Sequence, residues 1–194
     1  MNSTMTLSNR VATFQQIIQA SKISDDVSQN IPLEDGLTQW FKQLEELREA
    51  KKRLVIIGNG GSASVAAHAT TDFFNVAKLN ATTLHESSLL TCMSNDFGYE
   101  NAFARMIKQT MTQGDMLIAI SSSGNSMNIR NAVQTARDIG CETVTLSGFA
   151  HNNPLRSMGQ LNIWLDASDY GFVEVGHQFV LHNIADRMRI ALQS

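Results

Sequence analysis

Two short apolar segments of this chain each run straight into a loop of glycine, serine and asparagine. The first segment, residues 54–57, is followed by Gly-Asn-Gly-Gly-Ser at residues 58–62, here called the glycine loop. The second, residues 116–120, is followed by Ser-Ser-Ser-Gly-Asn-Ser at residues 121–126, the serine loop. Short apolar runs of this kind are typical of strands buried on both faces, as in parallel sheets. Two such strands that lead through a loop into a helix predict an α/β fold.

Strands and helices alternate through the rest of the chain as well. The two loops lead into helices expected at residues 63–74 and 127–139, and Gly140 stops the second helix. The alternation implies parallel βαβ units and a three-layer sandwich with helices on both faces of the sheet. The other expected strands are residues 82–84, 143–146 and 161–165, and the other expected helices are residues 87–93, 100–111 and 173–192.

The first fifty residues predict two helices on either side of a break at residues 25–34. Each helix carries apolar side chains at helical spacing, and for the first helix core packing and a subunit interface explain them equally well. We expect residues 1–52 to form a helical extension that packs on the domain or on a neighbouring subunit, and residues 53–194 to form the α/β domain. The two apolar stripes are Val11, Phe14, Ile17 and Ile18, and then Leu37, Trp40, Phe41, Leu44 and Leu47.

Composition excludes several classes of protein. A chain of 194 residues that is 43% hydrophobic suits one domain with a sizeable core. Its net charge of −3, spread over interspersed charges, gives no sign of a nucleic-acid or membrane-surface partner. Cys92 and Cys141, both in apolar stretches, make no disulfide framework and indicate a reducing compartment. Residues 1–11 lack the apolar core of a signal peptide, and no segment approaches the roughly 20 apolar residues of a membrane span, so we expect a cytoplasmic protein.

The serine loop has the chemistry of an anion site. Four hydroxyls and one glycine surround the start of a helix, where free N–H groups attract negative charge. A helix cap needs only one serine, so the surplus favours a dianionic phosphate monoester. The glycine loop is less specific, because Ala63 breaks the dinucleotide-binding spacing and no Gly-Lys-Ser/Thr ending is present. A tight turn without a ligand would also explain it, but its repetition beside a second strand favours a ligand at both loops.

Titratable side chains recur at helical spacing on two of the expected helices. His68 and Asp72 share a helix face, which suits a divalent metal or a base with its orienting carboxylate, although ordinary surface pairs have the same spacing. Glu174, Gln178 and His182 form a stripe on the last helix. Eight helical residues span about 12 Å, so Glu174 and His182 reach one metal only if both lean inward. Two solvated polar residues are the alternative.

The order and spacing of these motifs resemble the phosphoheptose isomerase family of SIS-domain proteins. The glycine loop is followed six residues later by His68, then by Ser-Asn-Asp-Phe-Gly-Tyr at residues 94–99, by Gly-Asp at residues 114–115 and by the serine loop. The similarity runs from about Arg53 to the C-terminus, with a matching helical lead-in. The serine loop marks SIS domains in general. The spacing from the glycine loop to His68 and the Asn-Asp-Phe-Gly element are specific to this branch.

The resemblance implies a fold, a reaction and an assembly. The fold is a mainly parallel, flavodoxin-like sheet, and the reaction converts sedoheptulose 7-phosphate into D-glycero-D-manno-heptose 7-phosphate, a precursor of surface-polysaccharide heptose. Members are homotetramers with sites at subunit interfaces, and several carry zinc, so we expect a sugar-phosphate ligand, one zinc per subunit and no nucleotide cofactor.

Carried over by position, the resemblance also assigns site residues. Asp72 and His182 would transfer protons, and a metal would be held by His68, Asp72, Glu174 and His182. The sugar phosphate would be held by Asn59, Gly60, Gly61, Ser62, Asn95, Asp96, Ser121, Ser122, Ser123, Ser126 and Glu174.

The chain departs from the family pattern at several of these places. The family has glutamate at Asp72, glutamine at Glu174 and an arginine close to the position of Val76. The segment from residue 72 to 95 is shorter, and residues 151–154 replace a usual Gly-Gly. Two other functions therefore stay open: a non-catalytic binding protein like the relative that associates with the DnaA initiator and lacks the catalytic carboxylate, and an isomerase of another ketose phosphate. The retained carboxylate of Asp72 favours an enzyme.

Overall fold

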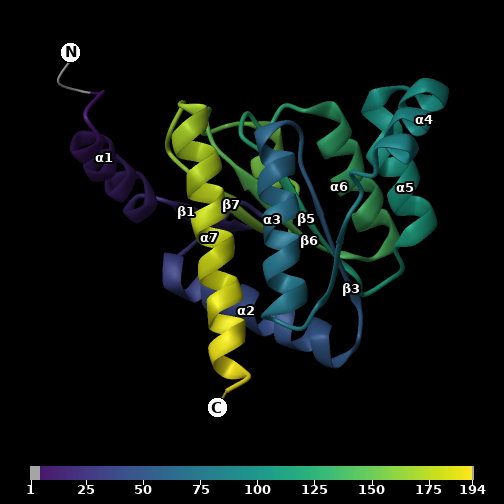
Figure 1. The fold of residues 1–194 in the computed structure, drawn as a ribbon, viewed down its shortest axis with the longest axis horizontal. Helices are drawn as coiled ribbons and strands as arrows, with labels where there is room; N and C mark the ends of the chain where they lie inside the picture. Colours follow the sequence, from purple (N-terminus) through teal and green to yellow (C-terminus); the bar gives the residue numbers. More distant parts are fainter. Residues whose placement is uncertain (1–4, 194) are drawn as a thin grey trace.

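The computed structural model describes residues 5–193 as an α/β sandwich built on one seven-stranded sheet (Figure 1). Residues 1–4, which open the expected N-terminal extension, and residue 194 lie outside the described part. The sheet has the order β2-β1-β7-β6-β5-β3-β4. Its strands are β1 (Lys22–Asp25), β2 (Asn30–Ile31), β3 (Arg53–Ile57), β4 (Asn80–Thr83), β5 (Met116–Ser121), β6 (Glu142–Ser147) and β7 (Leu161–Trp164).

The five strands from β3 to β7 are parallel, as the sequence predicts. Their spatial order reverses direction between β3 and β5, which is the doubly wound, flavodoxin-like arrangement. The expected fold class is therefore confirmed. Ligands of such sheets bind where the strand order reverses, at the carboxyl ends of the strands. The glycine loop follows β3 and the serine loop follows β5, so the two loops meet at that point.

Helices cover both faces of the sheet. On one face α2 (Leu33–Glu49), α3 (Gly61–Asn75) and α7 (Tyr170–Ala191) bury one apolar cluster, and α3 and α7 lie side by side (Figure 1). On the other face α5 (Ala102–Thr110) and α6 (Met127–Ile139) bury a second cluster. Successive residues of β3 alternate between the clusters, which explains why the strand is apolar throughout. The remaining helices are α1 (Leu7–Gln19), α4 (Ser87–Phe97), and the short 3-10 turns η2 (Tyr99–Asn101) and η3 (Pro154–Ser157).

The expected break at residues 25–34 also contains structure that the sequence did not reveal. β1 begins before the break and pairs antiparallel with β7, and β2 then pairs antiparallel with β1. Ile23 of β1 is fully buried and belongs to the same cluster as α2. Strands of four and two residues are too short to show a clear alternation of apolar and polar side chains, so the sequence did not predict them. The helix expected at residues 87–93 was also too short, because α4 runs on to Phe97.

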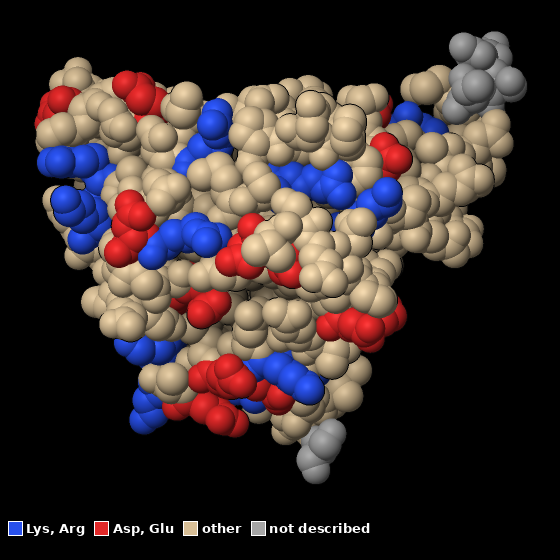
Figure 2. Space-filling view, turned by 180° about the vertical axis from the view of Figure 1, so that it is seen from behind, with Lys and Arg blue, Asp and Glu red and all other residues tan. Residues whose placement is uncertain are grey.

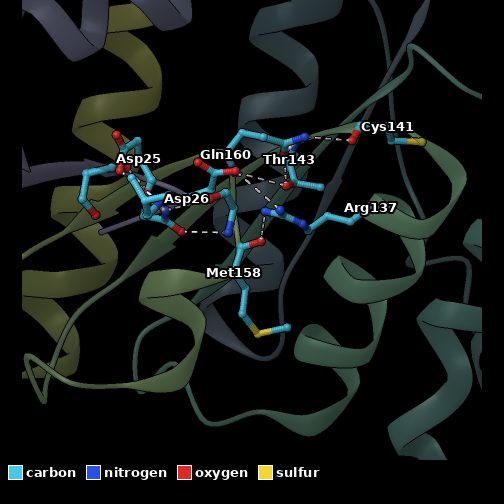
Figure 3. Close-up of polar contacts among 11 residues, drawn as sticks. Asp25, Asp26, Arg137, Cys141, Thr143, Met158 and Gln160 are labelled. Carbon is cyan, nitrogen blue, oxygen red and sulfur yellow. Dashed lines mark hydrogen bonds and ion pairs between the residues drawn. The ribbon is translucent and has the colours of Figure 1, made fainter. Parts of the chain in front are cut away.

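A polar network fixes the β1–β2 turn to the end of α6 and to the connection between β6 and β7 (Figure 3). Arg137 donates a 2.9 Å hydrogen bond to the carbonyl of Met158 and lies 3.6 Å from a carboxylate oxygen of Asp26. The amide oxygen of Gln160 accepts from the backbone N–H and the hydroxyl of Thr143. The turn is held through the carboxylate of Asp26 and through the carbonyl of Asp25, which accepts a 3.1 Å hydrogen bond from Nδ2 of Asn162.

Lysines, arginines and acidic residues are interspersed over the molecular face in Figure 2, without an extended area of one sign. No helix within residues 5–193 is both long and apolar enough to cross a membrane. Cys141 is buried, and burial raises the pKa of its thiol to about 11. Cys92 is exposed, contrary to the expectation of an apolar setting, because it lies on α4, which has no buried residue.

Candidate functional site

A cavity of about 230 Å³ lies where the strand order reverses. The glycine loop, the serine loop and the start of α7 enclose it. Nine residues assigned to the sugar phosphate are brought together here, and Ile120 and Tyr170 join them. The lining residues are Asn59, Gly60, Gly61, Ser62, Ile120, Ser121, Ser122, Ser123, Ser126, Tyr170 and Glu174.

The glycine loop requires glycine for two reasons: a backbone conformation that other residues rarely adopt, and neighbouring atoms that leave no room for a Cβ atom. Gly60 has a φ of +54°, where side chains are strained. A Cβ at Gly58 would lie 2.5 Å from the backbone oxygen of Ser62. At Gly61 a Cβ would overlap the carboxylate of Glu174, so that carboxylate lies against the first turn of α3. Because a negative charge already lies at this helix start, a phosphate is better accommodated at the serine loop.

The serine loop offers hydroxyls that the protein does not use itself. Ser126 precedes α6 but makes no capping hydrogen bond, and its hydroxyl lies 3.3 Å from that of Ser121. The hydroxyl of Ser122 is buried with no hydrogen-bond partner among the described residues. Ser123 accepts a 3.2 Å bond from the backbone N–H of Asn125. Unused donors at the start of a thirteen-residue helix form a binding site for an oxyanion.

Three residues missed by the sequence reasoning support the glycine loop. The amides of Asn59 and Asn128 exchange two hydrogen bonds, of 2.9 and 3.0 Å, and the hydroxyl of Tyr99 donates a 2.7 Å bond to Oδ1 of Asn59. The ring of His85 contacts the backbone of Gly58, and burial lowers the pKa of this histidine. Asn128 and Tyr99 are ordinary helix and turn residues in sequence, so only the fold reveals that they orient Asn59.

A second group of site residues lies further along α3 and α7. Nε2 of His68 is 3.5 Å, and Nδ1 of His182 is 3.1 Å, from Oδ2 of Asp72. The two rings pack edge to face with centroids 4.9 Å apart. Oδ2 of Asp72 is buried, yet neither contact has hydrogen-bond geometry. A buried carboxylate oxygen between two imidazole nitrogens, all within 4.8 Å of one another, is a donor set that suits a divalent metal.

Glu174 does not join this group, although it was assigned to the same metal. Its carboxylate lies at Gly61 in the cavity, and eight residues of helix separate it from His182. That separation of about 12 Å is the physical reason. Gln178, between them on the stripe, has a buried Nε2 with no hydrogen-bond partner among residues 5–193.

Asn95 and Asp96 lie apart from both groups. They are exposed on α4 and bond to each other at 2.9 Å, with the sulfur of Cys92 3.7 Å from Asp96. Neither lines the cavity within a single chain.

A doubly wound sheet with a serine-rich oxyanion loop at its switch point defines this chain as a SIS-domain protein, and the model of the SIS domain family matches residues 15–148. A phosphoheptose isomerase of Pelobacter propionicus is 33% identical over 156 residues, which cover 77% of this chain and 82% of that protein. A phosphoheptose isomerase of Helicobacter pylori is 32% identical over 160 residues, which cover 79% of this chain and 83% of that protein. The chain therefore belongs to the phosphoheptose isomerase family, a family of aldose–ketose isomerases.

Solved structures agree with the fold. A phosphoheptose isomerase from Francisella tularensis superimposes with a TM-score of 0.82 over 97% of this chain and 98% of that one, at 22% identity. The phosphoheptose isomerase from Neisseria gonorrhoeae superimposes with a TM-score of 0.79 over 94% of this chain and 98% of that one, also at 22% identity.

Proposed function

We propose that this protein interconverts a ketose phosphate and an aldose phosphate, with sedoheptulose 7-phosphate and D-glycero-D-manno-heptose 7-phosphate as the pair. The observation that carries the proposal is the pairing of Asp72 with His182, 3.1 Å apart, on the same two helices that reach the oxyanion cavity. Proton-transfer groups and a phosphate site on one rigid pair of helices are what this reaction needs.

The isomerisation moves one proton between carbons and one between oxygens. The carboxylate of Asp72 removes a proton from C1 of the ketose and returns it to C2 of the enediol. His182 accepts the proton of the C1 hydroxyl and delivers it to the C2 oxygen, which becomes the hydroxyl of the aldose. The serine loop holds the phosphate and so fixes C1 and C2 relative to Asp72. Glu174 and Asn59 orient the hydroxyls between the phosphate and the reacting carbons.

His68, Asp72 and His182 would hold a zinc ion, because the uncommitted oxygen of Asp72 lies between the two imidazoles. When bound, zinc would supply Lewis acidity that polarises the substrate carbonyl. This role would replace proton transfer by His182, because a metal-bound imidazole has no free nitrogen lone pair to accept a proton. Glu174 would be a ligand only in another side-chain conformation. Its negative charge, in place of a neutral amide, would weaken that polarisation.

The assembly we propose is a cytoplasmic homotetramer with sites shared between subunits. Val11 of α1 and both Val175 and Phe179 of α7 are exposed apolar residues, and Phe14 packs on Phe179. The exposure of Asn95 and Asp96 supports the same assembly, since they would contribute to a cavity only from another subunit. In this proposal α1 serves the interface, whereas β1, β2 and α2 belong to the sheet and core of their own subunit.

A turnover assay with a panel of C5 to C7 ketose phosphates tests the proposal. We expect the C7 substrate to be converted best, and Asp72→Asn to lower turnover by at least about a hundredfold while the protein still folds. Turnover confined to a different ketose phosphate would show that this other sugar is the substrate. Absence of turnover with every member of the panel would favour the binding-protein alternative.

A further inference from the structure

A second cavity, of about 300 Å³, lies between the β1–β2 turn and the connection from β6 to β7. It shares no lining residue with the first cavity. Its eight lining residues are three serines, three asparagines, His151 and Arg156. The wall therefore carries one permanent positive charge, many hydrogen-bond donors and no carboxylate. It also includes residues 151–153, where the chain departs from the family pattern.

Arg156 is held in place with much of its hydrogen-bonding capacity unused. Its guanidinium carbon lies 4.4 Å from the ring centroid of Trp164, and Nη1 donates a 2.7 Å bond to the carbonyl of His151. Nε and Nη2 have no protein partner within residues 5–193. A guanidinium fixed by stacking and by one hydrogen bond loses little freedom when its remaining donors bind an oxyanion in a fork.

Other polar groups of the wall are also unused. Ser24 is only 4% exposed, and its hydroxyl makes no hydrogen bond within the described part of the chain. The side chains of Asn30 and Asn152 make none there either. Because Ser24 lines the cavity, its hydroxyl can donate to a ligand there.

The carboxylates closest in sequence to this wall are occupied elsewhere. Oδ1 of Asp25 accepts the backbone N–H groups of Val27 and Gln29, at 3.1 and 2.8 Å. Asp26 pairs with Arg137 in the network of Figure 3. Asp166 acts on Arg156 only at long range, without an ion pair. The positive charge of Arg156 is therefore available to a ligand.

We propose that this second cavity is a binding site for a phosphate group, either inorganic phosphate or the phosphate of a sugar. A single fixed guanidinium surrounded by hydroxyls and amides matches one small oxyanion rather than a polyanion. The site does not depend on the isomerase activity proposed above.

The second cavity contacts the serine loop through Asn153. The Nδ2 atom of Asn153 donates to the carbonyls of Gly148 and Ala150, at 3.1 and 2.9 Å, and its Oδ1 occupies the place that a Cβ of Gly124 would take. The backbone N–H of Leu155 also donates to the carbonyl of Gly124 at 3.2 Å. The wall of the second cavity is thus packed directly on the loop of the first.

Calorimetric titration with inorganic phosphate tests the proposal, with Ser126→Ala to weaken the first cavity and Arg156→Met to remove the guanidinium of the second. We expect two sites in the unaltered protein, a loss of at least tenfold in affinity at one site in Arg156→Met, and the other site weakened in Ser126→Ala. The phosphate affinity of Arg156→Lys should lie between those of the unaltered protein and Arg156→Met. Arg189 is an exposed arginine on α7, and Arg189→Met should leave the affinity of both sites unchanged. An Arg156→Met protein that titrates like the unaltered one overturns the proposal.

A second substitution guards against a fold defect in Arg156→Met. Asn152→Asp leaves the stacking on Trp164 intact and places a negative charge in the cavity, so it should abolish the same site. Unchanged binding in a folded Asn152→Asp protein would also contradict the proposal. In the Ser126→Ala background, fructose 6-phosphate that binds tenfold more tightly than inorganic phosphate identifies a sugar phosphate as the ligand, and equal affinity identifies the free ion.

Discussion

Oδ2 of Asp72 lies 3.1 Å from Nδ1 of His182, although the two residues are more than one hundred positions apart in the chain. The packing of α3 on α7 creates this contact, and one turn earlier on α3 His68 approaches the same oxygen. Both side chains lie on packed helices rather than on a loop, so in the proposed reaction the pair is positioned before substrate binds.

The first prediction concerns Asp72. Asp72→Asn keeps the size of the side chain but removes the base, so kcat should fall by about 10²–10⁴-fold while KM changes little. Asp72→Glu, which restores the family residue, should retain more activity than Asp72→Asn. Asp186→Asn is a matched control, because Asp186 is an exposed carboxylate on α7 whose only ion-pair partner within residues 5–193 is Arg189. Equal kinetics for Asp72→Asn and Asp186→Asn would contradict the role of Asp72.

The second prediction concerns the metal. We expect elemental analysis to find one zinc per subunit, and chelation to abolish activity that added zinc restores. His68→Ala should lower the zinc content, because it removes one of the three converging donors. If the purified protein holds no metal and keeps full activity in chelator, the prediction of a zinc site is wrong and the Asp72–His182 pair acts without a metal.

The third prediction concerns the serine loop. Replacing Ser123 and Ser126 with alanine should weaken sugar-phosphate binding by about 2–4 kcal/mol, since each hydrogen bond to a charged group is worth roughly 1.5–3 kcal/mol and the two are not fully additive. Calorimetry measures the change. Ser88→Ala, an exposed residue on α4, provides the control. Affinity that stays the same after the double replacement would rule out phosphate binding at this loop.

A fourth prediction follows from the hydrogen bond between Tyr99 and Asn59. Tyr99→Phe removes the donor and leaves Asn59 held by Asn128 alone, so KM should rise severalfold with a smaller change in kcat. Tyr170→Phe keeps its ring at the edge of the cavity and serves as a comparison for the loss of a hydroxyl. A fall in kcat with KM unchanged would show that Tyr99 does more than orient Asn59.

The sequence predicted the parallel sheet and the meeting of its two loops, because apolar strands and their polar ends are local patterns whose placement follows from topology. It did not predict that Glu174 lies at Gly61 rather than with His182, since helical spacing leaves the direction of a long side chain open. The support of Asn59 by Tyr99 and Asn128 was also beyond reach, because that contact joins residues about 40 and 69 positions apart.

Acid should destabilise the fold through His177. This residue is fully buried on α7, where Nε2 lies 3.1 Å from the carbonyl of Ser147 and Nδ1 has no partner within the described chain. Burial is the main cause that lowers the pKa of His177 from 6.5 to about 4. The neutral ring therefore donates from Nε2, and a second proton would have to reside on the unpartnered Nδ1.

The sign of the effect follows from proton uptake. Between pH 6.5 and about 4 the unfolded chain binds a proton at His177 and the folded chain does not, so the free energy of unfolding falls as the pH is lowered through this range. At 1.36 kcal/mol for each pKa unit, the lowering of the pKa from 6.5 to about 4 makes the loss about 3–4 kcal/mol at most. The stability is fully present above pH 6.5. His85, whose pKa is also lowered by burial, adds a loss of the same sign.

Urea unfolding at a series of pH values, compared between the unaltered protein and His177→Gln, isolates the contribution of His177. Glutamine retains a donor for the carbonyl of Ser147 but does not titrate, so its stability should depend less steeply on pH between 4 and 6.5, although it starts lower at pH 7. His151→Gln, an exposed histidine, should keep the pH dependence of the unaltered protein. If His177→Gln keeps it as well, the buried imidazole does not carry the acid sensitivity, and His85 becomes the group to test.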